Sequence, residues 1–89
     1  QVIYSEEGRR NVFIAWSGSR YAQVEVIGSW DQWRRPIPLV WDFDQHYAVI
    51  DLRCGEYEYK FIVDGLHTYD KSKPVRDDWS GSYNNYFTI

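Results

Sequence analysis

The chain has 89 residues, a formal net charge of −3 and one cysteine, Cys54. This length predicts one domain, residues 1–89. The acidic balance argues against a general binder of nucleic acids, which needs a basic face. The lack of an apolar run of about 18 residues argues against a membrane-spanning helix. A single cysteine excludes an internal disulfide and favours a reducing compartment.

Seven short segments, taken in chain order, are typical of β-strands. They are rich in β-branched and aromatic residues or alternate between apolar and polar residues. In the clearest of them, EYEYKFIVDG, the odd-numbered residues from Tyr57 to Val63 share one face, and the even-numbered residues from Glu56 to Ile62 share the other. The predicted strands are 11–16, 22–28, 37–42, 46–52, 56–65, 66–70 and 83–89.

The segments between these strands carry turn and loop signals. Pro36 and Pro38 cannot donate ladder hydrogen bonds, so we expect 37–42 to be a short edge strand. The DG pair at 64–65 predicts a tight turn, and the polar segment 71–82 predicts a long loop. The first eight or so residues are expected to be loosely held. Because no segment has helical periodicity, about seven strands predict an all-β fold, an antiparallel β-sandwich.

The sequence gives little support for catalysis or metal binding. Glycosidases use paired carboxylates, but most of the 13 Asp and Glu residues alternate with apolar residues, as on a solvated sheet face. Asp42, Asp44 and His46 lack a third hard ligand at loop-motif spacing, so a polar hairpin loop is the better interpretation. Two histidines and one thiol are too few for zinc. We therefore expect no enzyme activity, no metal and no cofactor.

The tryptophans are more informative, because aromatic residues make up 19 % of the chain and some of these rings are expected to be left over for a surface. In GSWDQWRRPIPL, Trp30 directly follows a predicted strand and is expected in the core. Trp33 lies in a polar loop before two arginines and is expected on the surface. Trp16 and Trp41 end or lie within strand-like runs and are expected to be structural.

Trp79 is the second candidate for a surface ring. It lies in the polar loop sequence RDDWSGSYNN, where it either anchors the loop in the core or faces a ligand; we favour the ligand. An exposed indole is a flat apolar platform with one N–H donor. It can stack on the apolar face of a sugar, while neighbouring amides and charges bond the hydroxyls, or it can stack on a base. The acidic net charge favours the sugar.

Three stretches, VEVIGSWDQWRRPIPL, GEYEYKFIVDG and YNNYFTI, occur in the order and at the spacing found in the family-48 carbohydrate-binding modules. Residues 10–89 resemble this family, and most of all the glycogen-binding domain of AMP-activated protein kinase beta subunits. The resemblance implies an immunoglobulin-like β-sandwich that binds α-1,4-linked glucans (glycogen, starch, malto-oligosaccharides, cyclodextrin) without catalysis. It also implies other domains or subunits of a parent kinase complex as partners, and a cytoplasmic protein, or a plastid one if the parent associates with starch.

The resemblance further implies roles for three residues. Trp33 matches the stacking tryptophan of the first loop, and Lys60 matches the lysine whose ammonium reaches sugar hydroxyls. Asn84 matches the asparagine that bonds a sugar from the start of the last strand. The alternation within 56–65 places Lys60 on the outer face independently of the resemblance.

The sequence departs from the family pattern after VDG, where the family has a second tryptophan and this chain has His67. Imidazole is a smaller and more polar platform, and the lost stacking would cost about 1–3 kcal/mol by analogy with base stacking. We hypothesise that Trp79 supplies the second ring. The leading hypothesis is a module that targets a kinase or phosphatase parent protein to an α-glucan. The alternative is a degenerate module that acts as a protein–protein scaffold without sugar binding.

Overall fold

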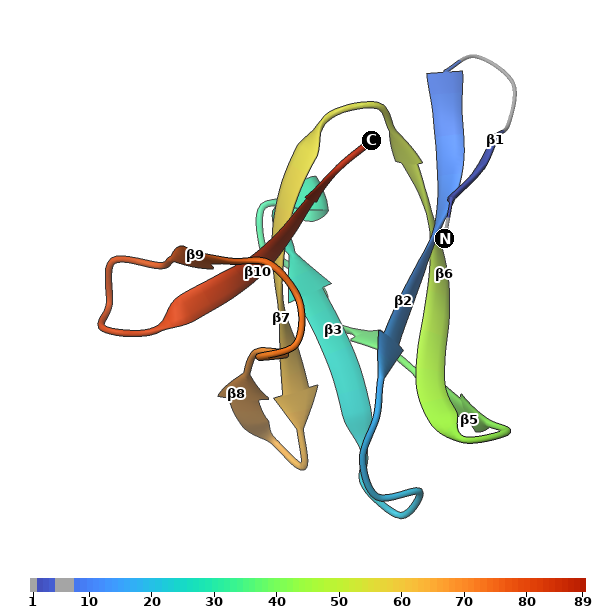
Figure 1. Cartoon of the computed structure of the whole chain (residues 1–89), viewed down its shortest axis with the longest axis vertical. Helices are drawn as coiled ribbons and strands as arrows, with labels where there is room; N and C mark the ends of the chain where they lie inside the picture. Colours follow the sequence, from blue (N-terminus) through green and yellow to red (C-terminus); the bar gives the residue numbers. More distant parts are fainter. Residues whose placement is uncertain (1, 5–7) are drawn as a thin grey trace.

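The computed structural model describes residues 2–4 and 8–89 and is shown in Figure 1. Ten strands lie within these residues, and a short 3-10 turn, η2 (Ser29–Asp31), follows the third strand. The strands are β1 (Val2–Tyr4), β2 (Arg9–Trp16), β3 (Val24–Gly28), β4 (Ile37–Pro38), β5 (Val40–Asp42), β6 (Gln45–Arg53), β7 (Glu56–Val63), β8 (Leu66–Thr68), β9 (Val75–Asp77) and β10 (Tyr83–Thr88).

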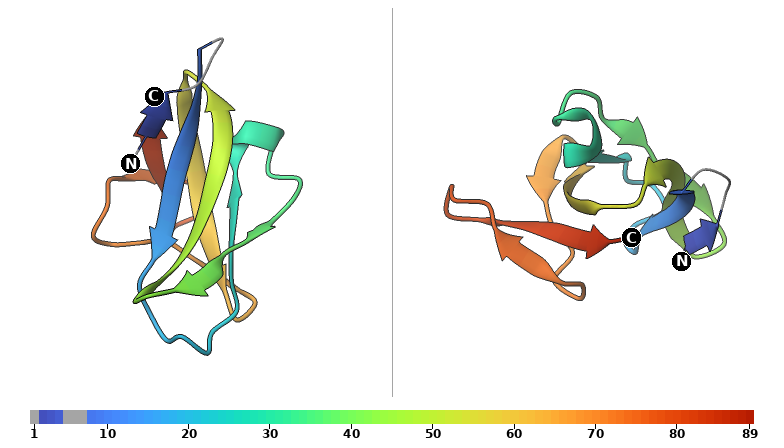
Figure 2. Two further views of the ribbon diagram at one scale, coloured as in Figure 1. Left: turned by 90° about the vertical axis from the view of Figure 1, so that its right-hand side faces the viewer. Right: turned by 90° about the horizontal axis from the view of Figure 1, so that it is seen from above.

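The strands form two sheets, which the views of Figure 2 show as two layers. One sheet has the order β1-β2-β6-β5, and the other has the order β4-β3-β7-β10-β9 with β8 paired to β7. The strand pairs in both sheets are antiparallel. The predicted antiparallel β-sandwich is therefore confirmed. Within the described residues, no helix has the length and hydrophobicity needed to cross a membrane.

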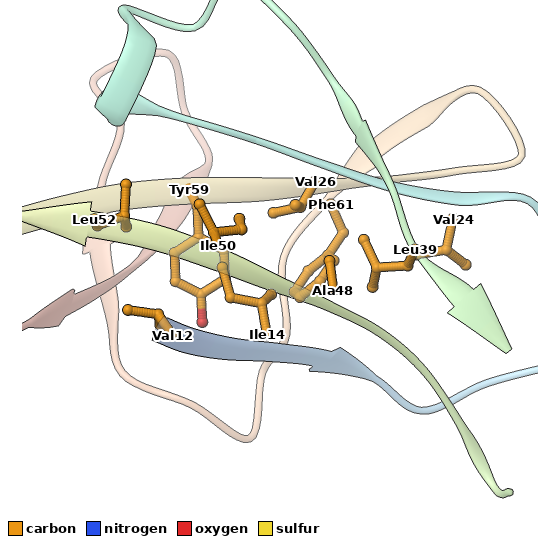
Figure 3. Packing of buried hydrophobic residues seen from close by; sticks show 10 residues of the cluster. All are labelled: Val12, Ile14, Val24, Val26, Leu39, Ala48, Ile50, Leu52, Tyr59 and Phe61. Atoms are coloured by element: carbon orange, nitrogen blue, oxygen red, sulfur yellow. The ribbon is translucent and has the colours of Figure 1, made fainter. Parts of the chain in front are cut away.

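The core lies between the inner faces of the two sheets (Figure 3). Side chains of a strand point alternately to opposite faces, so every second residue of β2, β3, β6 and β7 contributes to it. Phe61 of β7 is fully buried, and its ring centroid lies 4.9 Å from that of Trp16, which belongs to the opposite sheet. The buried hydrophobic residues of this cluster are Val12, Ile14, Val24, Val26, Leu39, Ala48, Ile50, Leu52, Tyr59 and Phe61.

The segment 37–42, predicted as one edge strand, is two strands that belong to different sheets. β4 is the edge of the larger sheet and β5 is the edge of the smaller one, so the edge position is confirmed. Between them Leu39 is buried, and its backbone N–H donates to the carbonyl of Val24 at 2.9 Å. The chain passes from one sheet to the other at Leu39, and the buried side chain of this residue lies in the core between them.

Two further strands were not predicted. The segment 71–82, expected to be one long loop, contains β9, in which Asp77 pairs with Tyr83 of β10. The residues of β9 have no strand pattern of their own, and the ladder with β10 makes them extended. Of the first eight residues, expected to be loosely held, 2–4 form β1 and pair with β2. The expectation for residues 1 and 5–7 lies outside the described part of the chain.

The tryptophans predicted to be structural pack as expected. Trp16 and Trp30 are half-buried and pack against the core cluster. Trp41 is also half-buried, and its ring meets the ring of His46 edge-on at 4.9 Å between centroids. Trp30 lies directly over Gly28, where a Cβ atom would overlap the six-membered part of the indole. Glycine is therefore required at position 28 by the close approach of this ring.

The substitution Gly28→Ala is expected to lower the free energy of unfolding by about 1–3 kcal/mol, because it overpacks the site that Trp30 occupies. Gly55→Ala is the matched control. Its Cβ would lie 3.6 Å from the Tyr57 hydroxyl oxygen, an ordinary contact, and we expect a change within about 0.5 kcal/mol. Chemical unfolding of the two variants measures the difference. Equal effects would contradict the role assigned to Gly28.

Candidate functional site

The outer face of the six-stranded sheet carries most of the predicted site residues. Glu58, Lys60 and Ile62 of β7 point to this face, because Tyr59 and Phe61 point into the core. The outward position predicted for Lys60 is therefore confirmed by the alternation of burial along β7.

Trp33 lies in the loop that follows β3, and its side chain is among the exposed large hydrophobic ones at 36 %. The surface position predicted for it is confirmed. Its backbone is left-handed, with φ of 61°, and its N–H donates to the carbonyl of Gly28 at 3.0 Å. The Asp31 carboxylate accepts hydrogen bonds from the backbone N–H groups of Arg34 and Arg35, each at 3.1 Å. The loop is thus ordered by its own hydrogen bonds on both sides of the ring.

Lys60 forms an ion pair with Asp78, with 2.9 Å between Nζ and Oδ2. The ammonium also donates to the backbone carbonyl of Tyr83 at 2.7 Å. The second carboxylate oxygen of Asp78 accepts bonds from the N–H and hydroxyl of Ser80, both at 2.8 Å, and from the N–H of Ser82 at 3.1 Å. This carboxylate therefore ties the β9–β10 loop together and ties it to β7. Sequence reasoning missed Asp78, because its partner lies on another strand.

Trp79 sits in this loop beside Asp78, and its side chain is 90 % exposed. The prediction that it lies on the surface and does not anchor the loop in the core is confirmed. Its backbone φ is 66°, and its N–H donates to the carboxylate of Asp77 at 2.6 Å. Two neighbouring aspartates thus hold the backbone on either side of the ring, while the indole itself extends into solvent.

Asn84, at the start of β10, is only 8 % exposed. Its Nδ2 donates to Oε1 of Glu58 at 3.0 Å, and its buried Oδ1 has no hydrogen-bond partner among the residues that the structure describes. Glu58 also pairs with Arg76 of β9, at 3.4 Å, and Arg76 bonds Glu56 at 2.9 Å and lies 4.1 Å from the centre of the Tyr86 ring. No local sequence pattern indicates this network, because its members come from three strands.

His67 is exposed on β8, where the register pairs it with Ile62 of β7. Ile62 points to the outer face as predicted, but it is buried there at 8 % exposure. It is flanked by His67 on one side and by Glu25 of β3 on the other. The neighbouring strands shield this side chain, so the outer face is not uniformly solvated.

The structure brings the predicted residues together to different degrees. Lys60 and the Trp79 loop are linked through Asp78, and Asn84 adjoins them through Glu58. The Trp33 loop reaches the same strand, because the Glu58 N–H donates to the hydroxyl of Ser29 at 3.0 Å. His67 lies further along the same face, beyond Ile62.

The residues considered as metal ligands, Asp42, Asp44 and His46, are not placed together to hold an ion. Asp42 ends β5 and Asp44 lies in the exposed hairpin turn that follows it, as predicted. His46 is buried, and its Nε2 lies 2.8 Å from the carbonyl of Ser19. Across residues 2–4 and 8–89, no group of three or more His, Cys, Asp or Glu side chains is placed to hold a metal ion.

An antiparallel β-sandwich does not by itself define a function, but indoles presented on ordered loops beside one sheet are features expected of a carbohydrate-binding module. The particular family is identified by comparison. The family model described as the glycogen recognition site of AMP-activated protein kinase matches residues 10–89, and the chain belongs to this family.

Individual relatives agree with this assignment. The chain is 39 % identical to 5'-AMP-activated protein kinase subunit beta-2 of Mus musculus over 81 residues, which cover 90 % of this chain and 29 % of that protein. It is 36 % identical to subunit beta-1 of Sus scrofa over 85 residues, covering 96 % of this chain and 67 % of that protein. For subunit beta-1 of Homo sapiens the identity is 35 % over 83 residues, covering 93 % and 30 %. The chain thus spans less than a third of the beta-2 relative.

The Lys60 ammonium, followed by the N–H and hydroxyl of Ser80, holds the pKa of Asp78 well below its ordinary value. A depressed pKa means that the unfolded chain binds the proton more readily. The stabilisation by this carboxylate is therefore fully present above about pH 4 and is lost as pH falls further. We expect the difference in unfolding free energy between wild type and Asp78→Asn to shrink below about pH 4.

The hydrogen bond from Arg76 lowers the pKa of Glu56. Because Glu56 is present in both wild type and Asp78→Asn, its contribution to the pH dependence cancels in the difference. Denaturant unfolding at several pH values gives the measurement. A difference that stays constant down to about pH 2 would contradict the ion pair as described.

Proposed function

We propose that this chain binds α-1,4-linked glucans, such as glycogen or starch, without catalysis. The observation that carries the proposal is the state of Trp33, an exposed indole on a loop that hydrogen bonds order before any ligand arrives. A flat apolar ring can stack on the C–H face of a glucose unit. A ring that is ordered beforehand loses less conformational entropy on binding.

Trp79 is proposed as the second stacking ring. His67 occupies the position at which the family has a tryptophan, and we propose it as a weaker contact, because an imidazole offers less apolar area. Asn84 is proposed to hydrogen-bond a sugar hydroxyl. Its Nδ2 is engaged by Glu58 and its Oδ1 is buried, so the side chain would have to move for this contact to form. Lys60 completes the proposed site.

We further propose that the module targets a larger parent protein to the polysaccharide. Support comes from the relatives, which are kinase subunits much longer than the matched region. Other domains or subunits of such a complex would be its protein partners, and malto-oligosaccharides and cyclodextrin would be its soluble ligands.

Trp33→Ala is expected to weaken the binding of β-cyclodextrin or a long malto-oligosaccharide about ten- to a hundredfold, because it removes the main stacking platform. Calorimetric titration measures the affinity. Phe43→Ala is the matched control, since Phe43 is 88 % exposed but lies in the β5–β6 turn of the other sheet. Circular dichroism verifies that both variants fold. Retained affinity in folded Trp33→Ala, or an equal loss in Phe43→Ala, would contradict the proposed site.

A second candidate function, protein docking, is favoured by the outer face of the smaller sheet. Val40 of β5 and Val49 of β6 are each 55 % exposed there. Phe13 pairs with Val49 across the β2–β6 ladder, and its ring stacks on Tyr47 at 5.3 Å between centroids. An apolar sheet face of this kind is a suitable surface for contact with another protein. It lies on the opposite layer from Lys60, so docking and glucan binding are compatible.

Val49→Asp in the full-length parent protein is expected to weaken docking and to leave glucan affinity unchanged. A carboxylate in an apolar contact is desolvated without a partner, which is unfavourable. Hydrogen exchange of residues 45–53 is compared between the full-length protein and the isolated module. Slower exchange is expected in the full-length protein. Equal exchange in both would contradict docking on this face.

A further inference from the structure

We propose that the Lys60–Asp78 ion pair positions the Trp79 ring for sugar stacking, so that Lys60 serves binding through the β9–β10 loop and not mainly through a contact of its own. Lys60 is then a positioning residue. This inference rests on the proposed function, because it concerns how the same glucan site is organised.

The first argument is the state of the Lys60 ammonium. It is engaged by the Asp78 carboxylate at 2.9 Å and by the Tyr83 carbonyl at 2.7 Å. The side chain of Lys60 is only 15 % exposed. Asp78 and Tyr83 thus engage two of the three N–H donors of this ammonium, and the ammonium brings its positive charge to the β9–β10 loop.

The second argument is the connectivity of Asp78. One of its oxygens meets Lys60, and the other accepts three hydrogen bonds from Ser80 and Ser82. The loop is closed a second time by the Asp78 N–H, which donates to the carbonyl of Ser82 at 3.1 Å. The Asp78 side chain is 10 % exposed. The Asp78 carboxylate therefore holds the part of the turn from Ser80 to Ser82 and joins it to Lys60 of β7.

The third argument is the exposure of the Trp79 ring, which the turn presents to solvent. Trp79 follows Asp78 directly, has a left-handed backbone and is 90 % exposed. The indole has almost no packing of its own, so the direction in which it points depends on the backbone that carries it. Gly81, at φ of 97°, supplies the other left-handed residue that the turn needs. Release of Asp78 from Lys60 would leave this ring on a mobile loop, and binding would then have to order it.

The test is a double-mutant cycle on Lys60→Met and Asp78→Asn, with β-cyclodextrin as the probe in calorimetric titrations at neutral pH. Asp78→Asn keeps an acceptor for Ser80 and Ser82 but removes the charge. Each single variant is expected to weaken binding about three- to tenfold, the cost of ordering a released loop at the moment of binding. The double variant is expected to bind no more weakly than the weaker single variant, because one interaction is removed in each case.

Three further variants sharpen the result. In a Trp79→Ala background, Asp78→Asn is expected to have no additional effect, because there is no ring left to position. Lys60→Arg, which can still pair with Asp78, is expected to retain most of the affinity. Asp51→Asn is the matched control; it breaks a pair with Arg9 on the other sheet and should leave the affinity unchanged.

A spectroscopic measurement reports the mobility of the ring directly. In protein labelled with 5-fluorotryptophan, the Trp79 resonance, assigned through Trp79→Phe, is expected to narrow in Asp78→Asn, because the ring already lies in solvent and the released loop moves faster. The inference is overturned if Lys60→Met weakens binding by the same factor with and without Asp78→Asn, since Lys60 would then contact the sugar itself. It is also overturned if the Trp79 resonance is unchanged in Asp78→Asn.

The two proposals fail in different ways. Wild-type protein that binds no glucan at millimolar concentration would overturn the proposed function, and the positioning of Trp79 for sugar with it. Wild-type protein that binds, with independent effects of Lys60 and Asp78, would leave the proposed function intact and overturn this inference alone.

Discussion

The packing of Phe61 between the two sheets is the contact on which the rest of the structure depends. Its ring is fully buried, meets Trp16 from the opposite sheet at 4.9 Å, and meets Tyr59 of its own strand at 5.6 Å. Because side chains alternate along a strand, the inward position of Phe61 and Tyr59 directs Lys60 and Glu58 outward. A register slip of one residue would bury both charged groups, so the core determines on which face the candidate site is built.

The strands that the sequence predicts well are those whose side chains divide clearly between core and solvent. β7 is the example, since aromatic residues such as Tyr59 alternate with charged ones such as Lys60. β9 was missed because its three residues, Val75 to Asp77, are extended only through their ladder with β10. The change of sheet at Leu39 was missed for a related reason. A run of apolar residues gives no indication of which of two sheets will receive each end.

The candidate site follows the same division. The exposure of Trp33 and Trp79 was predictable from their polar neighbours in the chain. The partners of the charged residues were not, because Lys60 meets Asp78 across 18 positions and the Asn84 amide meets Glu58 on another strand. Such contacts depend on strand register, which no local pattern encodes. The motif therefore predicts that Lys60 faces outward, but it does not predict that the Lys60 ammonium contacts Asp78 and Tyr83.

Both exposed tryptophans are presented by the same physical device. Trp33 and Trp79 each have a left-handed backbone, with φ of 61° and 66°, which is uncommon for a residue with a large side chain. Surrounding bonds must impose such a conformation. Near Trp33 the Asp31 carboxylate accepts two backbone N–H groups, and near Trp79 Asp77 and Asp78 do so. Folding thus meets the cost of ordering each loop backbone, and the Cα–Cβ bond of each tryptophan is directed toward the surface before any ligand binds.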